Sequence, residues 1–251
     1  MKNNLLNLKD KSKLILNLDE ENILETNKYF VSKIEEFWTD FNKNYQDLEK
    51  KYSKYLNNKN FFYQKEFLIK KSPIILLTTF FEKEKLYFVE SLIENLIDKK
   101  VNLKKFKNVI SLDVWKYLNL EEMTNDLFSI LASKYKQQKE KILKISKSLA
   151  NTTLISWSNK WAKTSIKEIK TDKKMDELIE DIEIEPTLII IDNVDKMDNN
   201  GWDLIIKIFQ FSKLKNLCFV LIIDSNKLDD INKGKFYSLK KYINYPIFEL
   251  I

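Results

Sequence analysis

The sequence predicts an α/β protein built on a parallel sheet with helices on both faces. Short, continuous apolar runs alternate with segments whose apolar residues recur at helical spacing. Strands of parallel sheets are buried on both faces, so they have this uninterrupted apolar character. The four predicted strands are residues 73–77, 109–112, 187–191 and 219–223. The predicted helices lie around residues 88–96, from about residue 120, and around 202–209.

Residues 1–60 carry no strand pattern, and we expect them to form a helical N-terminal extension of a core that spans residues 61–251. One apolar stripe at helical spacing predicts a helix that packs on this core. The stripe consists of Phe30, Ile34, Phe37, Trp38 and Phe41.

Composition excludes several kinds of active site. All 43 basic residues are Lys and there is no His, which excludes Ser-His-Asp and Cys-His nucleophilic sites, His-ligated metals and an arginine finger on this chain. The single cysteine, Cys218, allows neither an intrachain disulfide nor a Cys-cluster zinc site. Its apolar neighbours predict a buried side chain. The N-terminus lacks a signal-peptide pattern, and no apolar stretch reaches the roughly 20 residues that span a bilayer. We therefore expect a cytoplasmic protein, with peripheral membrane attachment as the alternative.

The strand at 187–191 ends in an acidic sequence, Asp192-Asn193-Val194-Asp195. A hydrophobic strand that ends in Asp resembles the Walker B segment of P-loop NTPases, in which the carboxylate supports Mg²⁺. The alternative interpretation is an ordinary buried strand that ends in an acidic loop.

Further segments follow in the order of the KAP family of P-loop NTPases. Residues 73–77 lie where the first strand and phosphate loop belong, and 108–117 is similar to that family's strand-then-tryptophan segment. Residues 216–224 look like the strand after Walker B, and 242–248 resemble the segment that closes the nucleotide-binding core. The resemblance covers about residues 61–251 and implies a parallel-sheet P-loop NTPase-like core that binds ATP and Mg²⁺.

The phosphate loop departs from the family pattern. The sequence G-x-x-x-x-G-K-[ST], placed after Leu77, puts Thr79 and Glu84 at the glycine positions, Lys85 at the lysine and Leu86 at the hydroxyl. Only Lys85 matches, and we interpret it as a solvated lysine rather than a phosphate ligand. Glu84 would also repel a phosphate bound at this position. A carboxylate about 4 Å from a phosphate charge weakens binding by roughly 4 kcal/mol at an effective dielectric constant near 20.

We expect two carboxylates in the same region to substitute for a bound phosphate anion. Glu82 and Glu84 near a helix N-terminus stabilise the helix dipole by about 0.3–1 kcal/mol. We also expect the bulky Phe80 and Phe81 to crowd the position of a phosphate cradle.

Walker B is altered as well. Asp192 and Asp195 match the KAP pattern, but Asn193 replaces the second acid and Lys196 replaces the arginine. An amide cannot accept a proton from water as a carboxylate does. We therefore expect no ATP hydrolysis. If the chain is active, the resemblance makes Asp192 and Asp195 the catalytic pair, with Lys85 and Asp192 on the nucleotide and Asp192 on the metal.

Positive charge is concentrated in residues 134–174, which hold 12 Lys and 3 acidic residues, against a net charge of +6 for the whole chain. This basic segment is predicted to be a helical insert with an apolar face and a lysine face. Its candidate polyanion-binding residues are Lys141, Lys144, Lys147, Trp157 and Trp161. The alternatives are a solvated lysine face, an anionic membrane surface, a nucleic-acid backbone with stacking tryptophans, or a protein partner.

The sequence as a whole favours a degenerate KAP-like protein that acts as a non-hydrolysing scaffold or binding module for a protein partner, with no cofactor expected. The first alternative is an ATP-binding or ATP-hydrolysing protein that uses ATP and Mg²⁺ with an unorthodox loop. The second is a basic protein associated with nucleic acid or a membrane surface.

Overall fold

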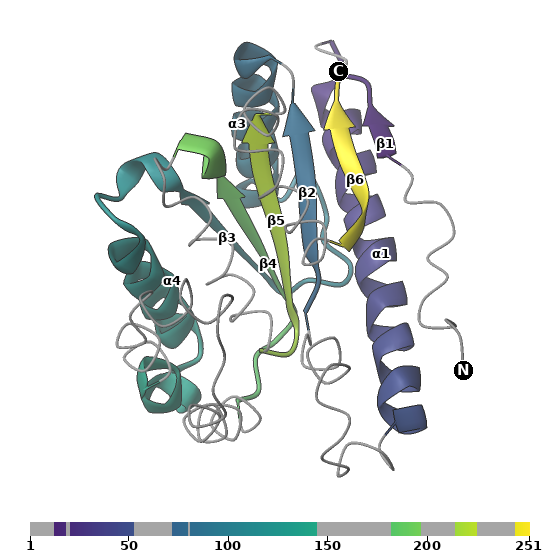
Figure 1. Ribbon diagram of the computed structural model, residues 1–251. Helices are drawn as coiled ribbons and strands as arrows, with labels where there is room; N and C mark the ends of the chain where they lie inside the picture. The colour runs from purple at the N-terminus through teal and green to yellow at the C-terminus, as the bar shows by residue number, and fades with distance from the viewer. Residues whose placement is uncertain are drawn as a thin grey trace, which may run out of the picture.

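The fold is described from a computed structural model of the chain, in which residues 13–18, 21–52, 72–79, 81–144, 182–196, 214–224 and 244–251 are placed (Figure 1). Six strands make one sheet, and all the recorded pairings are parallel. The strands are β1 (Lys13–Leu16), β2 (Ile74–Thr79), β3 (Asn108–Asp113), β4 (Thr187–Asp192), β5 (Leu217–Asp224) and β6 (Asn244–Leu250). Their order across the sheet is β1-β6-β2-β5-β4-β3.

The helix α1 (Ile23–Tyr52) and the helix α3 (Glu82–Ile97) cover one face of the sheet. The apolar side chains of α1 and α3 pack in one core with the strand residues that point to this face, Cys218 among them. Phe30 and Ile34 of α1 are fully buried, as the predicted stripe requires, and Cys218 is buried as expected. Burial of this kind of apolar surface is the main stabilising term of the layer.

The helix α4 (Leu120–Lys134) covers the opposite face, so the sheet is the middle of three layers (Figure 1). Its N-terminus is capped locally: the Asn119 side chain accepts a hydrogen bond from Glu122 N at 2.9 Å, and the Glu122 carboxylate accepts one from Leu118 N at 2.8 Å. This reciprocal pattern satisfies amides that the first helical turn leaves without partners. Met123, Leu127 and other apolar residues of α4 then fall on the buried face.

Strand β1 corrects the expectation that residues 1–60 are helical throughout. Lys13–Leu16 pairs in parallel with β6, and Leu16 is buried while Ile15 is 54% exposed. A four-residue strand with one buried apolar face has too weak an alternation to be recognised alone. Its strand conformation depends on β6, which is contributed by the other end of the chain.

The predicted fold class, an α/β protein with a parallel sheet and an N-terminal helix, is confirmed. The strand before the expected loop position (β2) leads directly into α3, and β2 and the Walker B-like strand (β4) end at the same edge of the sheet, with β5 between them. The predicted helix around residues 202–209 lies outside the described residues. Among the helices that are described, none is long and apolar enough to cross a membrane.

Candidate functional site at the carboxyl edge of the sheet

The carboxyl ends of β3 and β4 bring two carboxylates side by side. The strand register pairs Asp113 with Asp192, so both side chains stand at the edge where ligands bind in open parallel sheets. Asn193, which follows Asp192 directly, has φ of 59°. Asn tolerates this left-handed conformation better than most non-glycine residues. The chain therefore turns sharply at this point and directs polar groups back toward the strand ends.

Lys85 is part of this cluster, and the interpretation of Lys85 as a solvated lysine is wrong. The residue is only 2% exposed. Its Nζ donates a hydrogen bond to Asn193 Oδ1 at 2.6 Å and lies 3.7 Å from Asp192 Oδ1. Lys85 shares the buried face of α3 with Phe88, Val89 and Leu92, so the packing of that face against the sheet carries the ammonium group inward.

Asn193 connects the members of the cluster. Its side-chain Nδ2 donates to Asp113 Oδ1 at 3.0 Å, while its Oδ1 accepts from Lys85. Its backbone N donates to Asp192 Oδ1 at 2.7 Å, as expected for a carboxylate that satisfies a loop amide. Sequence reasoning treated Asn193 only as a lost acid and did not include Asp113 in the site. An Asn directly after a strand, with an Asp at the end of a neighbouring strand, is the signal that would have identified both.

The environment of Asp192 disfavours its charged form. Burial raises the pKa of this carboxyl above its ordinary value, and the nearby Asp113 and Asp195 carboxylates add to the rise. The Lys85 ammonium and the backbone N–H of Asn193 act in the opposite direction and lower the pKa. The ionised carboxylate thus depends on Lys85 for its main compensating charge.

The connection between β2 and α3 is too short for a phosphate loop. β2 ends at Thr79 and α3 begins at Glu82, so positions that would form the loop belong to a strand or a helix. The backbone N of Lys85 donates within the helix, to Phe81 O at 3.1 Å. Glu82 and Glu84 lie in the first turn of α3, as predicted. The Phe81 ring is 63% exposed and does not crowd this position, while Phe80 lies outside the described residues.

Asp195 connects the loop after β4 to the neighbouring strand β5 by a hydrogen bond. It lies in the 3-10 helix η5 (Val194–Lys196), is buried, and accepts a hydrogen bond on Oδ1 from Asp224 N at the end of β5, at 3.3 Å. Asp195 therefore fixes the loop after β4 to β5. Within the described part of the chain, no group of three or more acidic or Cys side chains is arranged to hold a metal ion.

Of the basic segment, the structure describes residues 134–144. Residues 139–144 are helical; Ile142 is buried in the core, Lys141 is partly exposed and Lys144 is exposed. This short stretch has the predicted apolar and lysine faces. Lys147, Trp157 and Trp161 lie outside the described residues.

The role of this lysine face remains a prediction. Replacing Lys141, Lys144 and Lys147 with Glu reverses three charges, so we expect at least tenfold weaker binding to anionic liposomes or nucleic acid and a shallower salt dependence. The measurement is a binding titration at 50 and 200 mM salt, with Lys99, Lys100 and Lys104 replaced by Glu as the control. Binding equal to wild type would assign the face to ordinary solvation.

Comparisons with known proteins give no family assignment: no family model matches, and no curated protein matches. The solved structures that are similar include the Aeropyrum pernix ORC1 protein in complex with DNA, at 10% identity and a TM-score of 0.37 over 70% of this chain and 39% of that chain. The Aeropyrum pernix ORC2 protein in ADPNP-ADP complexes is similar at 10% identity and a TM-score of 0.39, over 75% and 44% of the two chains. Drosophila ORC bound to AT-rich DNA and Cdc6 is similar at 13% identity and a TM-score of 0.37, over 85% and 57%. This chain thus spans about two fifths to three fifths of these three chains.

Proposed function

We propose that this protein is a degenerate, KAP-like member of the P-loop NTPase fold that does not hydrolyse ATP and acts as a scaffold or binding module for another protein. The observation that carries the proposal is the position of Lys85. Lys85 falls at the position of the family's phosphate-binding lysine. Its Nζ donates a hydrogen bond to Asn193 and lies 3.7 Å from Asp192 Oδ1, and Asp192 matches the family's Mg²⁺-supporting carboxylate.

Electrostatics argues against a metal ion at Asp192 while Lys85 stays in place. Two unit charges 4 Å apart interact with about 4 kcal/mol at an effective dielectric constant near 20, and a divalent ion doubles this figure. The ammonium already supplies the positive charge that a buried carboxylate needs. Asp192 Oδ1 also accepts the backbone N–H of Asn193, and Oδ2 lies 3.4 Å from Asn193 Nδ2. The residues present therefore fit an internal ion pair better than a Mg²⁺ site.

The short connection between β2 and α3 supports the same proposal. Phosphate loops bind through a wrapped series of backbone amides that only glycine-rich sequences allow. Here only two residues separate the strand from the helix, and two Glu lie in the first turn of the helix. What remains is a sheet edge closed by polar contacts, which suits a surface for a protein partner rather than a catalytic cleft. In the runner-up function, ATP binding, Lys85 leaves Asn193 for a phosphate and Asp192 turns to Mg²⁺.

A thermal-shift experiment separates the two functions. Ligand at about 100 times its dissociation constant stabilises a true binder by roughly 2.7 kcal/mol. We expect the melting temperature of wild type to be unchanged by Mg²⁺-ATP, and Asp192→Asn to shift it by the same amount with and without nucleotide. Phosphate release should equal that of a no-enzyme blank. A wild-type melting temperature several degrees higher with Mg²⁺-ATP, together with an Asp192→Asn variant that does not respond, would establish the ATP-binding alternative.

A further inference from the structure

A loop at the carboxyl edge of the sheet presents two large apolar side chains to solvent. It connects β3 to α4 and begins with the 3-10 helix η2 (Val114–Lys116). Trp115 is 65% exposed and Leu118 is 94% exposed. Residues three apart in a chain have Cα atoms within about 11 Å of each other. Both side chains therefore fit within the roughly 800 Å² that one partner covers in a standard interface.

Hydrogen bonds to side chains fix the backbone of this loop. The backbone N of Trp115 donates to Asp113 Oδ1 at 3.1 Å, and the backbone N of Leu118 donates to Glu122 Oε2 at 2.8 Å. A loop that is already ordered loses less conformational entropy when a partner binds. Tryptophan is also enriched among the residues that dominate the binding energy of interfaces. The loop thus has the properties of a preformed contact surface.

Three carboxylates surround the loop. Asp113 and Glu122 accept the two loop amides, and Asp126 Oδ2 accepts a hydrogen bond from the Tyr117 hydroxyl at 2.6 Å. Burial raises the pKa of Tyr117 above its ordinary value, and the hydrogen bond to Asp126 and the charges of all three carboxylates raise it further. Residues 113–126 contain four acidic residues and one Lys. The apolar side chains are therefore set in a negatively charged surface.

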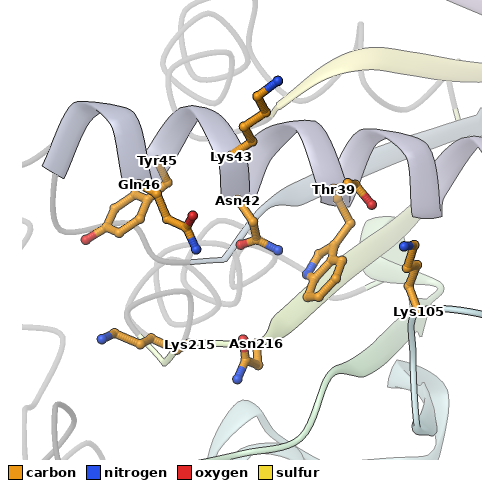
Figure 2. A pocket seen from close by; sticks show the side chains of 9 residues that line it. Thr39, Asn42, Lys43, Tyr45, Gln46, Lys105, Lys215 and Asn216 are labelled. Atoms are coloured by element: carbon orange, nitrogen blue, oxygen red, sulfur yellow. The ribbon is translucent and has the colours of Figure 1, made fainter. Parts of the chain in front are cut away.

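Lysines rather than carboxylates line a cavity at the opposite edge of the sheet. It has a volume of about 420 Å³ and lies between α1 and the segments that lead into β3 and β5. Its described lining includes Lys43, Lys105 and Lys215 and no Asp or Glu, and Figure 2 shows Lys105 and Lys215 well apart. The whole chain has a net charge of +6. The acidic character is thus a local property of the loop after β3.

We propose that this loop binds a basic, amphipathic helix of a partner protein. Trp115 and Leu118 contact the apolar face of that helix, and the surrounding carboxylates lie opposite its Lys or Arg side chains. A helix of this kind carries an apolar stripe and flanking basic residues on one side. The inference rests on the proposed scaffold function and assigns it a binding surface.

Charge selects this partner among those that an exposed apolar loop fits. The same loop of a second copy would bring like charges together, which disfavours self-association through it. Anionic membranes and nucleic acids carry the same sign of charge as the loop. A basic segment instead gains from opposite charges around the apolar contact.

Calorimetry with defined peptides tests the proposal. The probe is a helical peptide of about 18 residues, made of Leu and Lys with one apolar face. One control peptide has Ser in place of Leu, and the other has Glu in place of Lys. We expect the Leu/Lys peptide to bind at least tenfold more tightly than either control.

Substitutions in the protein locate the contact. The double variant Trp115→Ser with Leu118→Ser should bind the Leu/Lys peptide at least tenfold more weakly. Ile97→Ser is the matched control, because Ile97 is 72% exposed and ends α3 at the opposite edge; it should stay within about twofold of wild type. Glu122→Gln with Asp126→Asn keeps both hydrogen-bond acceptors but removes two charges. It should weaken binding at least threefold and make the salt dependence shallower.

Fluorescence gives a second readout, because the peptide contains no tryptophan. Binding should shift the protein's emission to shorter wavelength as Trp115 leaves water. Trp115→Phe keeps an aromatic ring, so it should bind within about threefold of wild type and show no such shift.

Other outcomes overturn the proposal. Equal affinity of wild type and the Trp115→Ser, Leu118→Ser variant would place the peptide elsewhere, and equal binding of the Ser/Lys peptide would remove the apolar contact. An oligomer of the protein alone, seen in sedimentation and lost in the double variant, would assign the loop to a second copy. The proposed scaffold function is tested separately. Absent peptide binding with a melting temperature unchanged by Mg²⁺-ATP would contradict this inference alone, whereas stabilisation by Mg²⁺-ATP would contradict the scaffold function on which it rests.

Discussion

Replacing Lys85 with Met is expected to destabilise the protein by about 3–5 kcal/mol at pH 7.5, because it leaves a buried carboxylate without its counter-charge. The side chains of Lys85 and Asp192 are 3% and 9% exposed, so solvent screens this pair little. The measurement is the free energy of unfolding in urea. Lys83→Met is the matched control: Lys83 is exposed on the same turn of α3, and its replacement should change stability by no more than about 0.5 kcal/mol.

A second variant distinguishes the lost ion pair from a packing defect. Lys85→Met combined with Asp192→Asn removes both charges, so it should recover at least half of the lost stability. If the double variant is as unstable as the sum of the two single variants, the ion pair is not the cause. A Lys85→Met protein within 1 kcal/mol of wild type would show that the ammonium is not held in the cluster at all.

The cost of Lys85→Met should also depend on pH. Burial already raises the pKa of Asp192 above its ordinary value of 3.8, and the Lys85 ammonium opposes that rise. Without Lys85 the folded-state pKa rises further, while the unfolded-state pKa does not change. Above pH 3.8 the folded variant then binds more protons than the unfolded variant, so its stability increases as pH falls. The destabilisation measured at pH 7.5 should therefore shrink toward pH 4.5, whereas a packing defect would give a constant difference.

Replacing Phe30 with Ala is expected to cost about 3–5 kcal/mol, the range for deleting a buried aromatic side chain. Phe30 belongs to α1, yet its ring packs edge to face on two other rings. The distance between ring centroids is 5.5 Å to Phe88 of α3 and 5.0 Å to Phe248 of β6. One side chain thus joins the N-terminal helix, the helix after β2 and the last strand. Such aromatic contacts add to the free energy of burial.

This variant tests whether α1 is a separate extension or an integral layer. We expect urea unfolding followed by circular dichroism and by tryptophan fluorescence to give one shared transition, shifted to lower urea in Phe30→Ala. Tyr29→Ala is the control, because the neighbouring Tyr29 is 45% exposed, and it should lose less than about 1 kcal/mol. Two separate transitions, with only the first shifted, would mean that α1 unfolds independently of the sheet.

The cluster at the carboxyl edge balances the charges that converge there with groups of the chain itself. Asp113 and Asp192 converge because parallel strands end together, and two adjacent carboxylates repel each other. A bound Mg²⁺ is one way to compensate them. Here Lys85 and Asn193 provide the compensation from within the chain. Both carboxylates thus lie in a network of contacts that the chain provides.

The sequence alone was enough for the elements with strong periodic patterns. The central strands β2, β3, β4 and β5 and the helices α3 and α4 lie where the apolar runs and helical spacing placed them. The mismatch with the phosphate-loop pattern is also plain from the sequence, because such a loop requires glycines and residues 78–86 contain none. These features depend on local periodicity and backbone preference, which neighbouring residues determine.

Only the tertiary structure decided which polar atoms meet. Lys85 is buried because α3 docks on the sheet through its apolar face, and Asn193 and Asp113 join it because β3 and β4 are neighbours in register. Strand β1 exists because β6, more than 200 residues away, offers a free edge. The sequence determined where the central strands and the helices α3 and α4 form, and that the loop glycines are missing. Strand order and register determined the site, because contacts between distant segments leave no periodic signal in the chain.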